Sequence, residues 1–358
     1  MRLRVIDQGQ AAPLASHAVP YGIARAMAAV DEPVLTLCTP DAPYISVGAN
    51  QDVAREIDRD YCRSRALPIL RREVGGGAVL LDPDQLYFHF VFSRRLAPER
   101  AERLFPRFIE PVLRTYADLG IAADYRPLND VQVDGRKLGA SAAAEIGEVV
   151  VVAGSFLFDF DRETMAASLR VPSEGFRDVL RRSLADHMTT MRQLLAERPS
   201  RDWVKALFCG HVATTLSVEP VEDMPTVEET IAIDAASVRH ADSAWVHRVG
   251  HKMVEGGVKI AEGVHLTEGE RRTTGGLVRA RLREQDGRIR DLDLTGDVTC
   301  LPADGLVRLA RRLTGLPVDP APALAAEIAI AVGALGLDLP GVTAEDLAET
   351  IRSSRVVE

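Results

Sequence analysis

A glycine-rich stretch, residues 71–82, contains residue types that can hold an anion. Two arginines precede three consecutive glycines, Gly75, Gly76 and Gly77, and apolar runs lie on both sides. Arginine supplies fixed positive charge for a carboxylate or a phosphate. Glycine is retained where the backbone takes a positive φ or where a ligand lies against bare amides. A glycine-rich hairpin between two strands explains the stretch equally well, and the spacings of a dinucleotide fingerprint or a Walker loop are absent.

A lysine follows a tight turn further along the chain. Asn129 and Asp130 begin a short run that is typical of a strand, and Asp134-Gly135 is a strong hairpin turn signal. Lys137 is therefore expected at the start of the return strand, on a rigid hairpin. Taken alone, this lysine is typical of a surface residue after a turn, and Asn129 and Asp130 are typical of a capped strand end.

The composition is that of an ordinary globular protein. The chain has 358 residues, 46% hydrophobic and 27% charged, which allows a large core and two domains. The net charge of −9 argues against a general nucleic-acid binder. We expect no membrane span, because no run of about 18 apolar residues occurs, and no signal peptide. The four cysteines form no C-x-x-C pair, so we expect neither a zinc ribbon nor a redox pair, and a cytoplasmic location.

Strands and helices are interleaved irregularly, which predicts an α+β fold with a mixed sheet rather than a doubly wound parallel sheet. The periodicities predict strands at 34–38, 44–48, 66–70, 86–92, 129–133, 136–142 and 149–157, and helices at 17–30, 52–66, 98–119 and within 162–216. Residues 219–228 are acidic and proline-containing, which is typical of a surface linker. Beyond it the pattern predicts a helix at 234–251, a hairpin within 275–294 and helices at 303–314, 320–335 and 343–353. The restart of strand patterning predicts a larger N-terminal domain over 1–254 and a smaller α+β domain over 257–358.

Two of these helices carry informative side chains. The apolar stripe of helix 98–119 consists of Leu104, Phe108, Val112 and Tyr116. His240, His247 and His251 share a similar face of helix 234–251, but the H-E-x-x-H pattern of a zinc site is absent, so we expect a solvated helix face.

In their order along the chain, the motifs resemble those of the lipoate–protein ligase family, within the biotin/lipoate protein ligase superfamily. They are R-R-x-x-G-G-G-A-V-x-x-D at 71–82, Asn129-Asp130, G-x-K-x-x-x-S-A at 135–142, and Gly154-Ser155-Phe156-Leu157. Gly48-x-Asn50-Gln51 is similar to an early strand end of that family, and residues 276–297 are similar to its C-terminal accessory domain. The resemblance covers nearly the whole chain and implies the fold of the family, a mixed-sheet catalytic domain flanked by helices.

The resemblance also implies a two-step reaction. ATP and lipoate, or octanoate, give an acyl-AMP and pyrophosphate, and a lysine of an acceptor lipoyl domain then attacks the mixed anhydride. Lys137 resembles the family's site lysine, a point charge between carboxylate and phosphate, and is the expected catalytic residue. The residues expected at the acyl-adenylate are Arg72, Gly75, Gly76, Gly77, Ala78, Val79, Ala142 and Gly154. Those expected at ATP and Mg²⁺ are Asn129, Asp130, Lys137 and Ser155, with Asp130 as the Mg²⁺ ligand.

The implied acyl site is an apolar slot beside the three glycines, lined by the strands that carry Val79, Phe88 and Val152. Such a slot distinguishes chain ends weakly, so octanoate is expected to be activated less efficiently than lipoate. The implied acceptor is a 2-oxoacid dehydrogenase E2 subunit, a glycine cleavage H protein or a lipoate-binding protein. We expect a monomer, without nucleic-acid or membrane partners, whose accessory domain supports activation.

Three positions depart from the family pattern. Family members commonly carry histidine where this chain has Leu81 and Ala153, and the glycine three residues after the site lysine is replaced by Ala140. These departures leave the acyl substrate and the rate open.

Three alternatives share the fold or the binding partner. Octanoyl or lipoyl transferases use a cysteine nucleophile, but no cysteine lies between Cys62 and Cys209. Biotin ligases carry a G-R-G-R-x-x-R-x-W loop, which is absent. A degenerate, non-catalytic scaffold that binds lipoyl domains is favoured by the missing histidines, whereas Lys137 and the three glycines favour catalysis.

Overall fold

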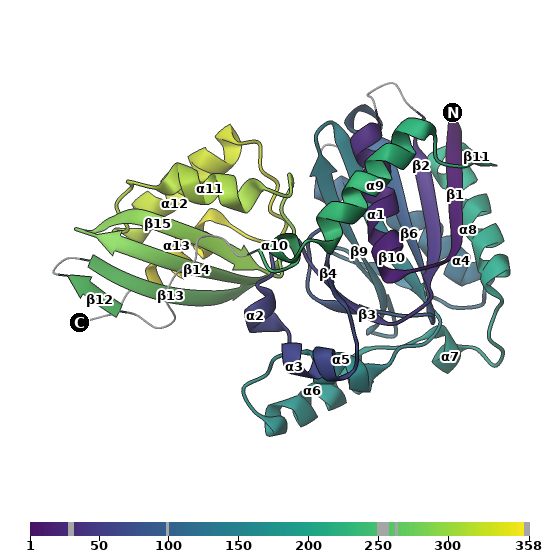
Figure 1. Ribbon diagram of the computed structural model, residues 1–358, viewed down its shortest axis with the longest axis horizontal. Coiled ribbons are helices and arrows are strands. Elements are labelled where there is room, and N and C mark those ends of the chain that lie inside the picture. Colours follow the sequence, from purple (N-terminus) through teal and green to yellow (C-terminus); the bar gives the residue numbers. More distant parts are fainter. Residues whose placement is uncertain (28–31, 98–99, 249–257, 262–263, 354–358) are drawn as a thin grey trace. The chain divides into compact units, whose positions relative to one another are not determined.

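The computed structural model describes residues 1–27, 32–97, 100–248, 258–261 and 264–353. They form two compact units (Figure 1). Unit 1 contains Met1–Val47, Val53–Val74 and Ala78–Val246, and unit 2 contains Gly48–Asp52, Gly75–Gly77 and His247–Glu358. The expected boundary at residues 254–257 falls outside the described residues, so the domains 1–254 and 257–358 stay a prediction.

An eight-stranded mixed sheet is the centre of unit 1, as the irregular interleaving predicted. The first two pairings, β11–β1 and β1–β2, are parallel, and the others are antiparallel. The strand order is β11 (Glu219–Glu222), β1 (Arg2–Ala11), β2 (Val34–Pro40), β6 (Gln85–Ser93), β10 (Val149–Leu157), β9 (Arg136–Ile146), β8 (Asp130–Val133) and β7 (Asp124–Arg126).

Helices cover both faces of this sheet. On one face, Phe88 and Phe90 pack against Phe208 of α8 (Arg201–Leu216), and Phe90 also packs against Phe108 of α4 (Ala101–Asp118). The predicted α4 stripe is confirmed, because its four members are buried. The other face is covered by α1 (Pro13–Ala26), against which α9 (Val227–Ala241) lies side by side (Figure 1). Gly22 of α1 permits this close contact, since a Cβ there would lie 2.5 Å from the Cα of Ile233.

A second sheet of three strands carries the glycine-rich stretch. Its central strand is β3 (Tyr44–Val47), which pairs in parallel with β4 (Ile69–Arg71) and antiparallel with β5 (Val79–Leu81). The hairpin interpretation of residues 71–82 is therefore wrong, because β4 and β5 lie at opposite edges of β3. The remaining helices of unit 1 are α2 (Val53–Glu56), α3 (Arg59–Ser64), η1 (Arg94–Leu96), α5 (Arg162–Ser168), α6 (Glu174–His187), α7 (Met191–Leu194) and α10 (Ser243–Val246).

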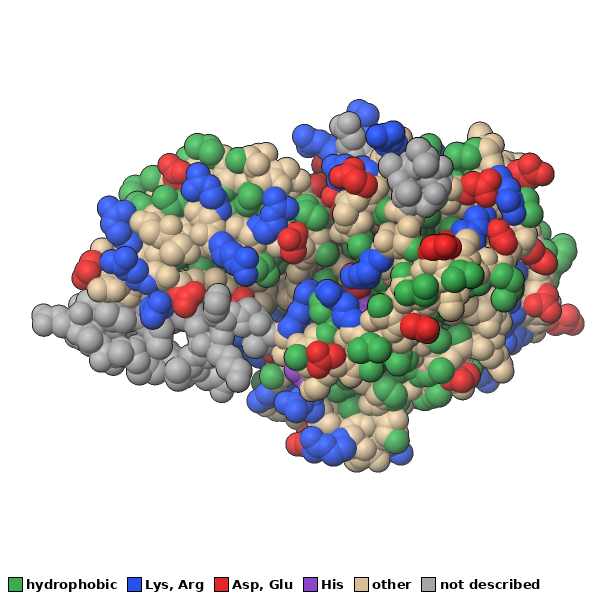
Figure 2. Space-filling model, turned by 45° about the horizontal axis from the view of Figure 1, so that its top comes forward, with side chains coloured by type: hydrophobic (Ala, Val, Ile, Leu, Met, Phe, Trp, Pro, Cys, Tyr) green, Lys and Arg blue, Asp and Glu red, His purple; other side chains and the backbone are tan. Residues whose placement is uncertain are grey.

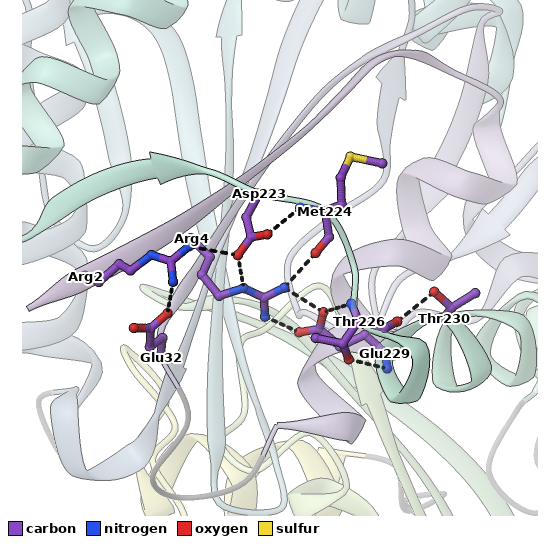
Figure 3. A network of polar contacts seen from close by, with 8 residues as sticks. All are labelled: Arg2, Arg4, Glu32, Asp223, Met224, Thr226, Glu229 and Thr230. Atoms are coloured by element: carbon purple, nitrogen blue, oxygen red, sulfur yellow. Dashed lines mark hydrogen bonds and ion pairs between the residues drawn. The ribbon is translucent and has the colours of Figure 1, made fainter.

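The expected linker at 219–228 is instead built into unit 1. Its first residues form β11, and an ion-pair network fixes the turn into α9 (Figure 3). Arg4 of β1 donates to both carboxylate oxygens of Glu229, at 2.6 and 2.9 Å, and to Asp223 at 2.9 Å. Thr226 and Glu229 form a reciprocal capping box at the start of α9. The acidic composition looked like a linker because the arginine that pairs with it lies more than 200 positions upstream.

Hydrophobic side chains also reach the surface among charged ones (Figure 2). On α9 these are Val227, Ile231 and Val238, whereas Ala236 and His240 on the opposite face are buried. None of the described helices is both long and apolar enough to cross a membrane.

Unit 2 is a small α+β structure. Its antiparallel sheet has the order β12 (Val258–Ala261), β13 (Val264–Thr273), β14 (Gly276–Gln285) and β15 (Arg288–Gly296). The expected hairpin is confirmed: Asp286 and Gly287 both take positive φ, at 52° and 74°, as in a two-residue turn. The helices α11 (Gly305–Leu313), α12 (Ala321–Ala334) and α13 (Ala344–Ser353) complete its core.

Candidate functional site

The β8–β9 hairpin presents Lys137 beside Asp130. The turn residues Asp134 and Gly135 take positive φ, at 49° and 76°, as the sequence predicted. Lys137 Nζ lies 2.8 Å from Asp130 Oδ1, with 42% and 33% of the two side chains exposed. Such an exposed pair contributes at most about 1 kcal/mol. The ammonium can therefore exchange the carboxylate for an incoming anion at little cost.

Asn129 fixes the position of Asp130 on the hairpin. Its side-chain amide donates to the carbonyl of Ser141, and its own carbonyl accepts from the Ser141 N–H at 2.8 Å. The residue thus extends the β8–β9 pairing by one step. This is the strand-end role, and it holds the neighbouring carboxylate in place.

The residues directly after α6, which no sequence pattern indicated, hydrogen-bond to the same hairpin. The Lys137 carbonyl accepts from the Thr189 N–H at 2.9 Å. The guanidinium of Arg136 donates to the carbonyl of Met188 at 2.6 Å, directly after α6. Because the chain is held on both sides of Lys137, its side chain starts from a fixed backbone. No local signal at 185–189 indicates this contact, which joins residues about 50 positions apart.

The neighbouring strands turn small residues to the face covered by α1. Ala142 of β9, Ala153 of β10 and His89 of β6 are direct cross-strand partners in one row, and Ser155 is the partner of Tyr87. The Ser155 hydroxyl donates to Gln85 Oε1 at 3.3 Å.

Gly154 lies on the opposite face of the sheet, where a Cβ would be 2.5 Å from the Phe88 ring. Phe88 and Val152, whose strands were expected to line an acyl slot, also turn to this face, toward α4 and α8. Gly154 is therefore required by core packing, and the side chains available on the α1 face are Tyr87, His89 and Ala153.

Both arginines of the glycine-rich stretch are buried and hydrogen-bond to backbone carbonyls within unit 1. Arg72 is buried and donates to the carbonyl of Ser46 at 2.7 Å. Arg71 is also buried, and it donates to the carbonyl of Val246 at 3.0 Å and accepts through its own carbonyl from Trp245 Nε1 at 3.0 Å. Burial lowers the pKa of Arg72, although a guanidinium stays charged at neutral pH. Arg72 was expected at the acyl-adenylate; the contacts described for it here are to the protein's own backbone, and its role toward a ligand stays a prediction.

Backbone geometry requires two of the three glycines, Gly75 and Gly76, whereas a Cβ on Gly77 would meet only ordinary contacts, the nearest with Asp297 Cβ at 3.7 Å. Gly76 has a φ of 86°, and a Cβ on Gly48 would lie 1.9 Å from the Gly76 carbonyl oxygen. A Cβ on Gly75 would lie 2.9 Å from the Cα of Thr299. Residues 75–77 cluster with unit 2, whereas Ala78 and the 39% exposed Val79 return to unit 1. Unit 1 therefore places Lys137, Asp130, Asn129, Ala142 and Ser155 on or directly beside neighbouring strands, with Val79 on the smaller sheet and Arg72 directly after its strand β4.

The departures from the expected pattern lie opposite aromatic or polar residues. Leu81 pairs with Tyr44, Ala153 pairs with His89, and Ala140 pairs with Asp130. Two of the three therefore face rings in the adjacent strand.

Those rings belong to a buried group, here called the histidine–tyrosine cluster, that the sequence analysis missed. It contains His17, Tyr21, Tyr44, Tyr87, His89 and His240. Neighbouring ring centroids lie between 4.4 Å, for Tyr87 and His89, and 6.4 Å, for His17 and Tyr21. The alternation of Tyr87 and His89 along one strand was the available signal, because such residues share a face.

The solvated interpretation of His240 is wrong, because its side chain is 0% exposed. His240 Nε2 lies 2.9 Å from Glu73 Oε1, and Arg25 donates to Glu73 Oε2 at 2.6 Å. Burial alone would raise the pKa of Glu73, but the hydrogen bonds from His240 and Arg25 outweigh burial and lower the pKa to about 2. Burial lowers the pKa of His89 to about 3 and that of His17 well below its usual value. His251 lies outside the described residues.

Comparison with known proteins gives a consistent family. The family model of the lipoyl protein ligase A/B catalytic domain matches residues 13–213. The lipoate-protein ligase LplJ of Bacillus subtilis is 25% identical over 187 residues, 52% of this chain and 56% of that protein. The octanoyltransferase LipM of Kyrpidia tusciae is 28% identical over 239 residues, 60% of this chain and 87% of that protein.

A solved structure shows the same fold. It is the bipartite lipoate protein ligase of Thermoplasma acidophilum, described with its E2 lipoyl domain. It is 24% identical, with a TM-score of 0.65, and covers 71% of this chain and 100% of that one. The chain spans a little over half the length of the Bacillus ligase that it matches.

Proposed function

The chain belongs to the lipoyl protein ligase A/B catalytic-domain family, and from this premise we propose that it is an ATP-dependent lipoate–protein ligase. It activates lipoate or octanoate as an acyl-AMP and transfers the acyl group to a lysine of an acceptor lipoyl domain. The observation that carries the proposal is the half-exposed Lys137 ammonium, held beside Asp130 on a braced hairpin.

Activation brings two anions together. A carboxylate oxygen of the acid attacks the α-phosphorus of ATP, the bond from that phosphorus to the bridging oxygen breaks, and pyrophosphate leaves. Lys137 exchanges its contact with Asp130 for the α-phosphate and the reacting carboxylate. A positioned ammonium stabilises the charge that develops there more in the transition state than before it.

Transfer follows at the same place. The neutral amine of the acceptor lysine attacks the acyl carbonyl, the bond from that carbon to the phosphate oxygen breaks, and AMP leaves while the amine releases a proton. Mg²⁺ takes one or two carboxylates together with phosphate oxygens and water. Asp130 is a partly exposed carboxylate that fits this donor set, and Asn129 holds it in place.

The raised pKa values of the cysteine thiols favour a ligase over a transferase that works through a thioester. Such a nucleophile must be a thiolate. Burial raises the pKa of Cys38 and Cys300 to about 12 and that of Cys62 and Cys209 to about 11. None of the four lies on the three strands that carry Lys137 and its neighbours.

The acceptor is proposed to be an E2 lipoyl domain, an H protein or a lipoate-binding protein, and residues 257–358 are proposed to support activation. The test is lipoate-dependent ATP–pyrophosphate exchange, followed by mass spectrometry of candidate acceptors. Exchange together with a lipoyl mass increment on an acceptor is expected. Acyl transfer from an acylated carrier protein without any ATP requirement would replace the ligase by a transferase.

A further inference from the structure

Four polar atoms of the histidine–tyrosine cluster are buried without a hydrogen-bond partner among the described residues. They are His17 Nδ1, Tyr21 Oη, His89 Nε2 and His240 Nδ1. Beside the larger effect of burial, weak backbone hydrogen bonds of Arg71 and Val74 act on the pKa of His17 and Tyr21 respectively, but neither contact has the distance and angles of a full hydrogen bond to these two atoms. Nearly all buried polar groups in proteins are hydrogen-bonded, and each exception calls for an explanation. Four exceptions in one cluster of touching rings indicate that another molecule completes it.

In each of the three histidines, the other ring nitrogen has a hydrogen-bond partner, and this contact fixes the orientation of the ring. His17 Nε2 lies 3.2 Å from Ser46 Oγ, His89 Nδ1 lies 3.4 Å from Thr36 Oγ1, and His240 Nε2 lies 2.9 Å from the Glu73 carboxylate. Tyr44 differs from Tyr21, because its hydroxyl lies 2.6 Å from Ser16 Oγ.

The chemistry of the cluster suits a neutral hydrogen-bonding group. His17 and His89 are neutral because burial lowers the pKa of each. The Glu73 carboxylate accepts from His240 Nε2–H, so Nδ1 is the atom of this ring that is left to meet a guest. The buried guanidinium of Arg72 interacts electrostatically with the phenols of Tyr87, Tyr21 and Tyr44. Its positive charge disfavours a cationic guest at the cluster. No group of described residues is arranged to hold a metal ion.

A floor of small side chains leads from Lys137 to the cluster. Ala142 is on the same strand as Lys137, and its row continues through Ala153 to His89. From strand spacings, His89 lies about 10 Å across the sheet and about 17 Å along it from Lys137. An acid whose carboxylate is held at Lys137 would therefore extend its far end over Ala142 and Ala153 toward the four unpartnered atoms.

We propose that the histidine–tyrosine cluster binds the far end of the acyl substrate and that this end carries a neutral hydrogen-bonding group. This inference rests on the proposed function and names the class of acid that it uses. A hydrocarbon end leaves the four polar atoms buried and unsatisfied, whereas a terminal hydroxyl both donates to an imidazole nitrogen and accepts from Tyr21. Sites built to hydrogen-bond a hydroxyl reject analogues that lack it far more strongly than apolar slots do.

The test compares octanoate with 8-hydroxyoctanoate, which differ in one hydroxyl, on the full chain. Calorimetric binding is expected to be at least about 100-fold tighter for the hydroxy acid, with the same preference in ATP–pyrophosphate exchange. Equal binding of the two acids, as expected if the cluster holds only ordered water, would overturn the inference and leave the proposed function standing. Selective binding of the hydroxy acid without exchange would support the inference and reject the ligase.

Two isosteric variants locate the preference. Tyr21→Phe removes an unpartnered hydroxyl and should reduce the preference for the hydroxy acid at least tenfold. Tyr116→Phe, the matched control, removes a buried tyrosine hydroxyl outside the cluster, which accepts from the Leu157 N–H, and should leave the preference unchanged. Equal effects of the two substitutions would contradict the assignment. The comparison of the two acids on the unaltered protein remains decisive if Tyr21→Phe fails to fold.

Discussion

Glu73 and His240 are 167 positions apart in the sequence, and Glu73 Oε1 lies 2.9 Å from His240 Nε2 inside unit 1. The pair joins the segment directly before the three glycines to the end of α9. Arg25 of α1 completes the contact from the other side of the carboxylate. One buried carboxylate therefore connects three elements that no local sequence pattern relates.

Glu73→Gln should destabilise the protein in a pH-dependent manner. The folded-state pKa of Glu73 is about 2, below its ordinary value of 4.5. Ionisation therefore stabilises the fold above pH 4.5, and this contribution is lost as the pH falls toward 2. The shift corresponds to about 3 kcal/mol, so urea unfolding should show a loss of up to that size at pH 7 and a smaller loss at pH 3.5.

The control for this variant is Glu163→Gln, which alters a carboxylate that is 74% exposed. We expect it to change stability by less than about 0.5 kcal/mol. A Glu73→Gln effect that is equal at both pH values would show that shape, and not charge, is what this position contributes.

Gly154→Ala should destabilise the core of unit 1. A Cβ would lie 2.5 Å from the Phe88 ring, which is buried between the sheet and α8. Overpacking of this kind costs about 1–3 kcal/mol. Gly210→Ala is the matched control, because the added methyl on α8 meets nothing within 4 Å and should stabilise the helix by up to about 1 kcal/mol. Equal melting temperatures for the two variants would refute the packing role of Gly154.

Alkylation at neutral pH should leave the exchange reaction intact. The raised pKa values of Cys38, Cys62, Cys209 and Cys300 keep these thiols protonated, and a protonated thiol reacts slowly. We expect iodoacetamide at pH 7.5 to modify little protein, as followed by intact mass, without loss of lipoate-dependent exchange. Rapid single-site modification that abolishes acyl transfer, with protection by an acyl donor, would favour the cysteine-dependent transferase.

Features with local signals were predictable from the sequence. The Asp134-Gly135 turn, the α4 stripe and the alternation in β14 and β15 each arise from residues only a few positions apart. These patterns follow from backbone geometry and from one buried face. They sufficed to place Lys137 and Asp130 on one hairpin.

Features that depend on distant partners were not predictable. The acidic run at 219–228 begins with a strand, β11, and leads into α9, because β1 pairs with the strand and Arg4 pairs with the acidic side chains. The local sequence of the glycine-rich stretch is compatible with a hairpin, because nothing local shows that β3 separates β4 from β5. His240 looked solvated on its own helix, and only Glu73, from another part of the chain, accounts for its burial.

Lys137→Ala gives the most direct test of the central claim, that this ammonium stabilises the charge formed during activation. Lipoate-dependent ATP–pyrophosphate exchange should fall by roughly 10²–10³ with an unchanged circular dichroism spectrum, because the side chain is half-exposed and its ion pair is weak. Lys137→Arg should restore little, since a planar guanidinium does not replace a compact point charge. Lys205→Ala, which breaks another lysine–aspartate pair of unit 1, with Asp7, should retain exchange. Near-normal exchange by a well-folded Lys137→Ala protein would contradict the claim and the mechanism built on it.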